Sequence, residues 1–290
     1  MNITKPNSIV LTLVLAATIV VATSSTAVAG PWVKQPGEAY LKLSGDYFSS
    51  DEAFDVDGEL QESPYTYSHR AVRAFGEVGL AESVGLQFSA PFMASTNKVS
   101  DYSRYDRWGF GDMDLAVQYQ IFEGGCAASV ASWARVPLYG GVIARDATVN
   151  AGGSSGDPYT PALGDGSVDV GAKGAVGCPL SSSVESWAAV EAGPRYRTAG
   201  FGPSLDYAFD AGAFIIPDRL ALSGRVGGVQ RLTENNERPT KSYIDVGSSL
   251  LFQVRDSIAL EAGGNYIPHG AYIARGWSAH LGVSFSGQLF

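Results

Sequence analysis

The stretch YIDVGSSLLFQV, residues 243–254, decides the fold class because its apolar and polar side chains alternate. Successive side chains of a β-strand point to opposite faces, so a period of two indicates a strand with one apolar face. That face would carry Ile244, Val246, Ser248, Leu250, Phe252 and Val254. The opposite face would carry Tyr243, Asp245, Gly247, Ser249, Leu251 and Gln253. We therefore predict a long strand that lies between an apolar and a polar environment.

Alternating segments of this kind fill most of the chain after Gly30. About twelve can be marked, near residues 38–48, 67–80, 84–94, 110–122, 126–137, 165–177, 184–198, 203–215, 219–232, 242–254, 257–268 and 276–290. They match the roughly 9–11 residues that cross a membrane as a strand, and short and longer connections alternate between them. The sequence therefore predicts an all-β fold, a transmembrane antiparallel up-and-down β-barrel of about twelve strands, with about ten or fourteen as alternatives.

The composition agrees with a β-protein and excludes other classes. The 290 residues include 35 Gly, about 12% against a typical roughly 7%, and Gly is costly inside helices. A hydrophobic fraction of 45% with 17% charged residues excludes an intrinsically disordered chain. The formal net charge of −9 argues against nucleic acid as a partner, because such domains carry a clustered basic face.

The N-terminal residues have the features of a secretory signal peptide. The apolar run IVLTLVLAATIVVA, residues 9–22, is too short to span a bilayer as a helix. It is followed by Ala27-Val28-Ala29, the small-residue pattern at which signal peptidase cleaves. We expect residues 1–29 to be a cleaved signal peptide and residues 30–290 to form an outer-membrane β-barrel. The alternative is an uncleaved N-terminal anchor.

The chain end, WSAHLGVSFSGQLF, resembles the signal by which outer-membrane barrels are recognised for insertion. The expected partners are therefore outer-membrane lipid and the barrel-assembly machinery, whereas the oligomeric state stays open. Leu281, Val283 and Phe285 have the opposite parity to the final Phe290, and a bulge near Gly287 would correct this. The main alternative fold is a soluble, exported β-sandwich or barrel, which would also alternate.

Two stretches share a layout of a Pro near a strand end, a long loop and a return strand that opens with a Gly-Asp step. The residues that carry this layout are Pro91, Gly109, Gly111, Asp112, Leu115 and Tyr119, then Pro137, Gly164, Asp165 and Gly166. The arrangement resembles the outer-membrane barrel family named for meta-pathway phenol degradation and transport. That resemblance implies a barrel that moves small, often aromatic or hydrophobic, compounds.

The two cysteines predict a structural disulfide. Cys126 follows one short turn and Cys178 precedes the next, so antiparallel pairing of the intervening strands would bring both to the same rim. Exported proteins fold in an oxidising compartment, which favours the bond. The alternative is two unpaired, buried thiols. Two Cys and three scattered His predict no metal site, and nothing in the chain indicates a cofactor.

Charged residues of both signs recur on the polar faces of the predicted strands. We predict that the pore-lining residues are Arg73, Asp112, Asp114, Arg135, Asp169, Lys173, Glu191, Arg195, Arg225, Asp245 and Glu261. They would line a polar path that selects solutes. The alternative is a cross-strand salt-bridge network that fills a narrow lumen, because isolated buried charges are costly.

Aromatic residues gather near the ends of the predicted strands, where outer-membrane barrels carry interfacial girdles. Trp32, Tyr40, Tyr47, Trp108 and Trp277 are among them. The cluster at residues 102–108 has an alternative role, the capture of an aromatic or hydrophobic solute.

The predicted function is passive uptake or channelling of a small-molecule solute, hydrophobic or aromatic if the resemblance holds. A structural or adhesive surface barrel is the first alternative. A barrel lipid hydrolase is the second, with His69, His269 or His280 as the base beside a serine. No compact motif surrounds these histidines, so the sequence predicts no catalytic residue and no enzyme.

Overall fold

The computed structural model describes residues 30–139, 160–180, 184–233 and 238–290, so the predicted signal peptide lies outside the described residues. Thirteen strands occur in this part of the chain. They are β1 (Glu38–Phe54), β2 (Leu60–Ala81), β3 (Val84–Ser100), β4 (Ser103–Phe110), β5 (Asp112–Glu123), β6 (Ala127–Pro137), β7 (Asp169–Pro179), β8 (Ser186–Arg197), β9 (Ser204–Ile216), β10 (Leu220–Arg231), β11 (Ser242–Arg255), β12 (Ile258–Ala271) and β13 (Ile273–Gln288). The described residues contain no helix long and apolar enough to cross a membrane.

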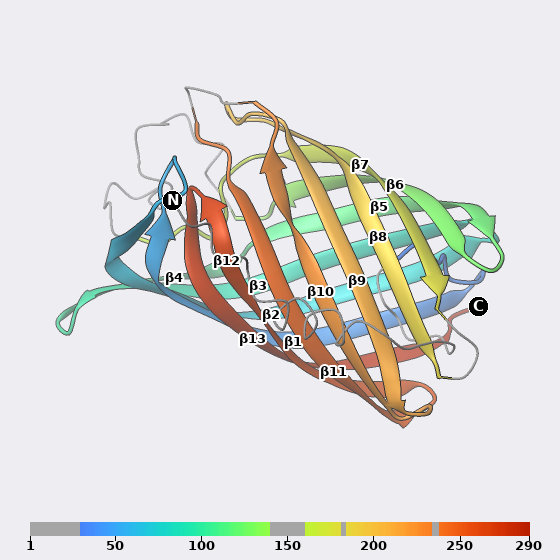
Figure 1. Ribbon diagram of the computed structural model, residues 1–290. Coiled ribbons are helices and arrows are strands. Elements are labelled where there is room, and N and C mark those ends of the chain that lie inside the picture. Colours follow the sequence, from blue (N-terminus) through green and yellow to red (C-terminus); the bar gives the residue numbers. More distant parts are fainter. Residues whose placement is uncertain (1–29, 140–159, 181–183, 234–237) are drawn as a thin grey trace, which may run out of the picture.

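The described strands form one antiparallel sheet that closes into a barrel (Figure 1). Strands that follow one another in sequence pair with each other, except that β4 and β5 both pair with β3, and β1 pairs with β13. β4 and β5 continue one another along β3, with a break at Gly111, whose N–H donates to the carbonyl of Pro91 at 2.9 Å. The ring therefore has twelve strands in the described part of the chain, which confirms the predicted fold and number.

Two of the predicted long loops are strand extensions. β1 and β2 continue past the barrel and pair as far as Phe54 and Leu60, and β3 and β4 form a second hairpin that projects at the left of Figure 1. We call this end of the barrel the long-loop mouth and the opposite end the short-turn mouth. The strand predicted to start at residue 165 begins only at Asp169, because residues 165–168 belong to a segment that enters the barrel.

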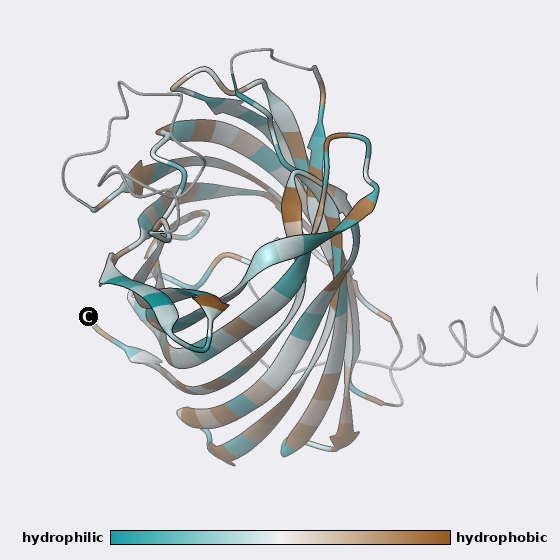
Figure 2. Ribbon diagram, turned by 90° about the vertical axis from the view of Figure 1, so that its left-hand side faces the viewer, coloured by the Kyte–Doolittle hydropathy of each residue, from teal (hydrophilic) through white to brown (hydrophobic). Residues whose placement is uncertain are grey.

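The distribution of side chains is the reverse of that in a soluble protein. From Tyr243 to Val254 on β11 the burial alternates residue by residue, and Val246, Leu250 and Phe252 are 37%, 45% and 44% exposed on the outside. In contrast, Asp169 and Ser167 are fully buried on the inside. Figure 2 looks into the long-loop mouth and shows hydrophobic and hydrophilic residues alternating along the strands. Apolar side chains on the outer wall are stable only against an apolar medium, which argues against the soluble alternative.

The last strand keeps one register over the part that contains Gly287. β13 pairs with β1 without interruption from Trp277 to Gln288, so the expected bulge near Gly287 is wrong. Phe290 lies beyond the strand, and the N–H of Leu289 donates to the carbonyl of Gly37 at 2.8 Å. The outward residues of β13 are those with odd numbers, because the apolar side chains of the strand have that parity.

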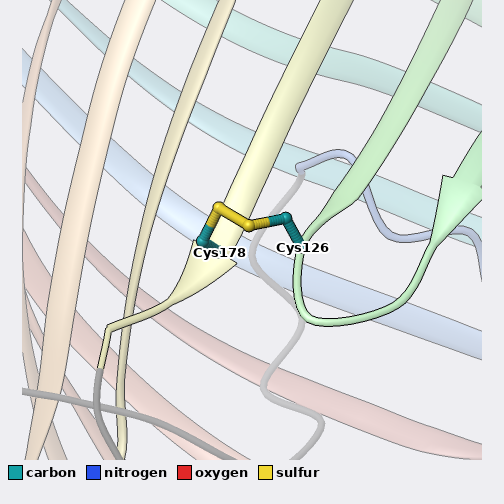
Figure 3. Close-up of a disulfide and its surroundings, with 2 residues drawn as sticks. All are labelled: Cys126 and Cys178. Atoms are coloured by element: carbon teal, nitrogen blue, oxygen red, sulfur yellow. A yellow bond between two sulfur atoms is a disulfide. The ribbon is translucent and has the colours of Figure 1, made fainter.

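The predicted disulfide is present. Cys126 precedes β6 and Cys178 lies near the end of β7, with their Cα atoms 4.2 Å apart (Figure 3). Their strands pair directly beside the bond, at Ala127 and Gly177. The bond therefore fastens two adjacent strands at the short-turn mouth and closes a loop that contains the long connection between them.

The outward position of Leu250 gives a test of the membrane-facing wall. Leu250→Arg places a charge near the middle of the apolar belt, and we expect the free energy of unfolding to fall by about 2–4 kcal/mol in phospholipid vesicles. The matched control is Leu251→Arg, which points inward and lies opposite Glu261. Guanidinium unfolding followed by Trp fluorescence measures both. Equal losses in the two variants would contradict the assignment of the faces.

The lumen as candidate functional site

All eleven predicted pore-lining residues lie on the inward faces of their strands. Strand parity fixes this, because the neighbouring residues of each strand carry the exposed apolar side chains. The structure therefore brings Arg73, Asp112, Asp114, Arg135, Asp169, Lys173, Glu191, Arg195, Arg225, Asp245 and Glu261 into one lumen. That they line a solute path stays a prediction.

Most of these charges are paired across neighbouring strands. Arg135 on β6 donates two hydrogen bonds to the carboxylate of Asp114 on β5, at 2.7 and 3.0 Å. Lys173 on β7 approaches Glu191 on β8 at 3.3 Å. Such pairing neutralises charges that would be costly alone in a narrow lumen. The salt-bridge network considered from the sequence is therefore real, and any path runs between its members.

The network continues around the wall through Arg225 on β10. Its guanidinium lies 3.0 Å from Asp210 on β9 and 3.6 Å from Glu191. Asp245 approaches from the other side over Gly227, where an added Cβ would lie 3.4 Å from both Arg225 Nε and Asp245 Oδ1. Three acids thus surround one Arg.

A second group of charges borders a cavity of about 300 Å³ between β12, β13, β1 and β2. Glu261 accepts a hydrogen bond from Lys42 Nζ at 2.6 Å and lies 2.9 Å from His280 Nε2. Arg73 Nε donates to Asp46 at 3.2 Å in the same cavity. The rings of Tyr40 and Phe75 also line it. The cavity is thus a part of the lumen that side chains leave unfilled. Its charged groups are bonded to one another, and aromatic rings form most of the rest of its lining.

At the long-loop mouth, residues 160–168 enter the barrel, and we call them the mouth strap. Pro161 and Leu163 in this segment are buried. Ser167 Oγ donates to Asp169 at 2.6 Å and is 2.8 Å from Asp165. Arg197 at the end of β8 is the common partner: it pairs with Asp165, lies 3.2 Å from Asp169 and donates to Ser167 at 2.9 Å. One guanidinium thus holds the strap to the wall.

Further arginines, on β8 and on the connection before β11, surround the mouth strap and Asp169. Arg195 Nε donates to Asp169 at 2.9 Å, so Asp169 is bonded to two arginines while fully buried. The carbonyl of Asp165 accepts a bond from Arg238 at 3.4 Å, and the ring of Phe201 lies between Arg197 and Arg238, at 4.1 and 5.1 Å. Contacts that reach from β8 to the connection before β11 fix the strap inside the mouth.

The Gly-Asp-Gly sequence noted above has a structural reason. Gly166 has a φ of 74°, which favours glycine, and its N–H donates to the hydroxyl of Tyr139 at 2.8 Å. A Cβ on Gly164 would lie 2.5 Å from the Tyr139 hydroxyl and 2.7 Å from a carboxylate oxygen of Asp112. The first copy of the motif meets the same segment, because a Cβ on Gly109 would lie 2.9 Å from Leu163. The two stretches that share the Gly-Asp layout therefore pack against each other.

The ionisation of Asp165 supports this attachment over a wide pH range. Burial acts to raise the pKa of Asp165, but Lys241 and Arg197 outweigh it and hold the pKa well below its ordinary value of 3.8. Because the pKa is depressed in the folded state, the carboxylate stabilises the strap at neutral pH. This contribution is lost only as the pH falls through the depressed pKa.

At the short-turn mouth, residues 30–36 lie inside the barrel, and we call them the N-terminal segment. The backbone of Gly30 accepts a bond from Gln118 at 2.8 Å, and the N–H of Val33 donates to Gln120 at 2.8 Å. Both glutamines are buried on the inner face of β5. Pro36 ends the segment with a backbone bridge to Gly79 on β2. The segment therefore crosses the inner wall from β5 to β2 and narrows this mouth.

Glycines on the wall make room for the N-terminal segment. A Cβ on Gly177 would lie 2.6 Å from Trp32, and a Cβ on Gly79 would lie 2.1 Å from the carbonyl of Gln35. The girdle interpretation is therefore wrong for Trp32, which packs inside. It is also wrong for Tyr40, which is buried and lines the cavity described above.

The outer aromatic residues fit the girdle interpretation. Tyr47 and Trp277 pack at 5.3 Å between ring centroids, and Trp108 is 73% exposed on the outer wall. The inner wall has its own aromatic residues. Phe48 stacks on His69, Trp133 has Lys173 and Arg195 near its ring, and Trp187 packs on Phe214.

The three histidines, candidates for a hydrolase base, occupy different surroundings. His280 is bonded to Glu261 inside the lumen, His69 stacks on Phe48, and the ring of His269 meets Phe54. A serine hydrolase needs a serine hydroxyl beside the base. Among the described residues, the hydrogen bonds and ring contacts of these three rings are with a carboxylate, a phenol and phenylalanines.

Sequence reasoning missed the two internal segments and the residues that hold them. Gln118 and Gln120 share the inward face of a predicted strand with two acids, so they gave no separate signal. The proline pair Pro31 and Pro36 directly before the first strand was the available sign of an extended segment. Arg197, near the end of a predicted strand, gave no signal that set it apart from the other charged residues.

Comparisons with known proteins give a fold but no family. No protein-family model matches the chain, and no curated protein matches it. Among solved structures it is similar to an outer membrane channel from Pseudomonas putida F1, with a TM-score of 0.66 and 13% identity over 91% of this chain and 100% of that one. The NanC porin also matches, with a TM-score of 0.48 and 8% identity over 84% of this chain and 98% of that one. The first of these likenesses shows a shared barrel fold.

The attachment of the mouth strap can be tested by Asp165→Asn. The amide keeps the shape but loses the ion pair with Arg197, so we expect amide hydrogen exchange in residues 160–168 to rise several-fold at pH 7. In the unchanged protein the protection should persist at pH 4, after correction for intrinsic rates, because the pKa of Asp165 is depressed. Asp218→Asn, in an exposed turn at the other mouth, is the control. Unchanged exchange in Asp165→Asn would show that the ion pair does not hold the strap.

Proposed function

We propose that the protein is an outer-membrane channel for passive uptake of small molecules, exported with residues 1–29 as a cleaved signal peptide. The observation that carries the proposal is the inside-out barrel: apolar side chains cover the outer wall, and paired charges and cavities occupy the lumen. A closed barrel is the β-structure that can lie in lipid, because all its backbone groups are paired. The likeness to an outer membrane channel from Pseudomonas putida F1 supports this reading.

A channel accounts for the lumen better than a purely structural barrel does. A structural barrel needs only a filled interior, whereas this one holds a cavity of about 300 Å³ between two narrowed mouths. Hydrogen bonds and ion pairs hold the segments that narrow the two mouths. Among the described residues, no disulfide joins either segment to the wall. Such contacts can open without unfolding the barrel.

The inner aromatic residues support a hydrophobic or aromatic solute. The indole N–H groups of Trp133 and Trp187 are buried and have no hydrogen-bond partner among the described residues. They border inner-wall glycines, since Trp133 would meet a Cβ on Gly171 and Trp187 one on Gly212. Aromatic rings on the inner wall give a hydrophobic or aromatic solute surfaces to pack on.

The alternatives give different experimental results. A structural or adhesive barrel would conduct neither ions nor solutes. A barrel lipid hydrolase would release fatty acid from a phospholipid substrate, and His280→Ala would abolish that release. Conductance without lipid hydrolysis is the result that our proposal requires.

Channel opening at the short-turn mouth can be tested with one glycine pair on β7. Gly177→Val directs a side chain at Trp32 and Pro31 and should displace the N-terminal segment, so we expect single-channel conductance in planar bilayers to rise at least about threefold, since these contacts are weak individually. Gly174→Val is the matched control, because a Cβ there meets nothing within 4 Å. If both variants conduct like the unchanged protein, the N-terminal segment does not limit the channel.

The solute class can be tested in a Gram-negative host with N-phenyl-1-naphthylamine, a neutral aromatic probe that fluoresces after crossing the outer membrane. We expect expression of the protein to speed its uptake without speeding that of nitrocefin, a hydrophilic anion. Ser223→Trp fills the lumen and should remove the effect, whereas Leu222→Trp on the adjacent outward position should keep it. Faster uptake of nitrocefin alone would reverse the proposed preference.

A further inference from the structure

The extended hairpins at the long-loop mouth carry a polar hollow on their outer wall. It has a volume of about 320 Å³ and lies over β1, β2, β3 and β4. Arg70, Lys98, Arg104 and Arg107 line it, against a single acid, Asp106. This hollow is separate from the lumen, because Arg70, Lys98 and Arg104 have the outward parity of their strands.

The register places the hollow directly above the apolar belt. Arg70 lies opposite Tyr47 on β1 and Ala94 on β3, and Ala94 lies opposite the exposed Trp108 on β4. One step nearer the barrel, Val72 faces Phe92, and both are exposed apolar residues. One step farther out come hydroxyl and charged side chains. The basic group therefore sits at the level where an apolar wall gives way to a polar one, beside interfacial aromatic rings.

The basic groups in this hollow are available to a ligand. Among the residues that the structure describes, no hydrogen bond or ion pair engages the side chain of Arg70, which is exposed. Lys98 pairs with Asp101 at 2.7 Å and Arg104 with Asp106 at 2.8 Å, but all four side chains are at least half exposed. Exposed ion pairs contribute little, so an anion can compete for both bases.

We propose that this hollow binds the phosphorylated headgroup of a lipid in the outer leaflet, the leaflet that the longer loops of outer-membrane barrels face. Arg presents a planar fork of donors that matches phosphate, and Lys adds a point charge. The hydroxyls of Ser68 and Thr66, which also line the hollow, supply further donors. The acyl chains of such a lipid would lie along the exposed apolar wall below, beside Phe92 and Trp108. The inference rests on the membrane location proposed above.

The position of the hollow favours a lipid over a free anion. A site for a soluble phosphate needs no contact with the apolar belt, whereas these bases begin one pair of residues above it. The net positive lining is also unusual in a chain of formal net charge −9. Charge complementarity and contact with the belt together identify a molecule that is anionic at one end and apolar at the other.

The test measures binding of diphosphoryl lipid A to the purified, full-length mature protein by native mass spectrometry from detergent. We expect Arg70→Gln to weaken binding about fivefold, since one basic residue at a membrane surface contributes about one tenfold step or less. Arg70→Gln with Arg104→Gln should weaken it by about twentyfold or more. The matched control is Arg255→Gln, an exposed base at the short-turn mouth, which should bind like the unchanged protein.

Three comparisons separate the outcomes. Phosphatidylcholine should bind no differently to the unchanged protein and the double variant, and millimolar inorganic phosphate should not displace lipid A. Equal binding of lipid A to the unchanged protein and the double variant would overturn the proposal, and so would displacement by inorganic phosphate, which would indicate a free-anion site. Heat-modifiable migration and bilayer conductance are recorded for each variant. Failure of the unchanged protein to bind lipid A while it shows both properties would overturn this inference alone, whereas absence of both properties in the unchanged protein would overturn the proposed channel.

Discussion

The pairing of every strand edge is the constraint on which the rest of this molecule depends. β1 pairs with β13 and β2 with β3, so the sheet has no free edge within the barrel, and its backbone groups need no water. With the backbone satisfied, the outer wall can be apolar, as Leu250 and Leu281 show. The inner wall must then take the polar half of each alternating strand. Charges crowd into a narrow interior as a consequence, and they are stable there because they pair across strands.

The crowding also explains how the two mouths are closed. A charge on the inner wall that has a second partner can hold a segment that is not part of the barrel, as Arg197 holds Asp165. A buried amide does the same at the other mouth, where Gln120 accepts the N–H of Val33. Glycines such as Gly177 supply the space that these segments occupy. The lumen thus has a wall held by continuous strand pairing and two internal segments, the mouth strap and the N-terminal segment, that a few side-chain contacts hold in place.

The wall was predictable from the sequence and the attachments were not. Alternation is local, so residues 243–254 reveal their strand and both of its faces without knowledge of the partner. The contact of Val33 with Gln120 joins residues 87 positions apart, and no local pattern encodes it. The faces of aromatic residues were equally hidden: Tyr47 points outward and Tyr40 inward, although both were expected at the girdle. The hairpin extensions were predicted as loops because polar residues occur on both of their faces, so the apolar–polar alternation that marks a strand is absent.

The pairing of the inner charges bears on what can pass. An ion entering the lumen would meet groups such as Asp114 and Arg135 that already satisfy each other, and breaking that pair would leave one charge uncompensated. A neutral solute needs no such exchange, because it carries no charge that must be compensated. The pairing that stabilises a charged interior therefore leaves a charged solute little to bind, which favours the neutral solute proposed above.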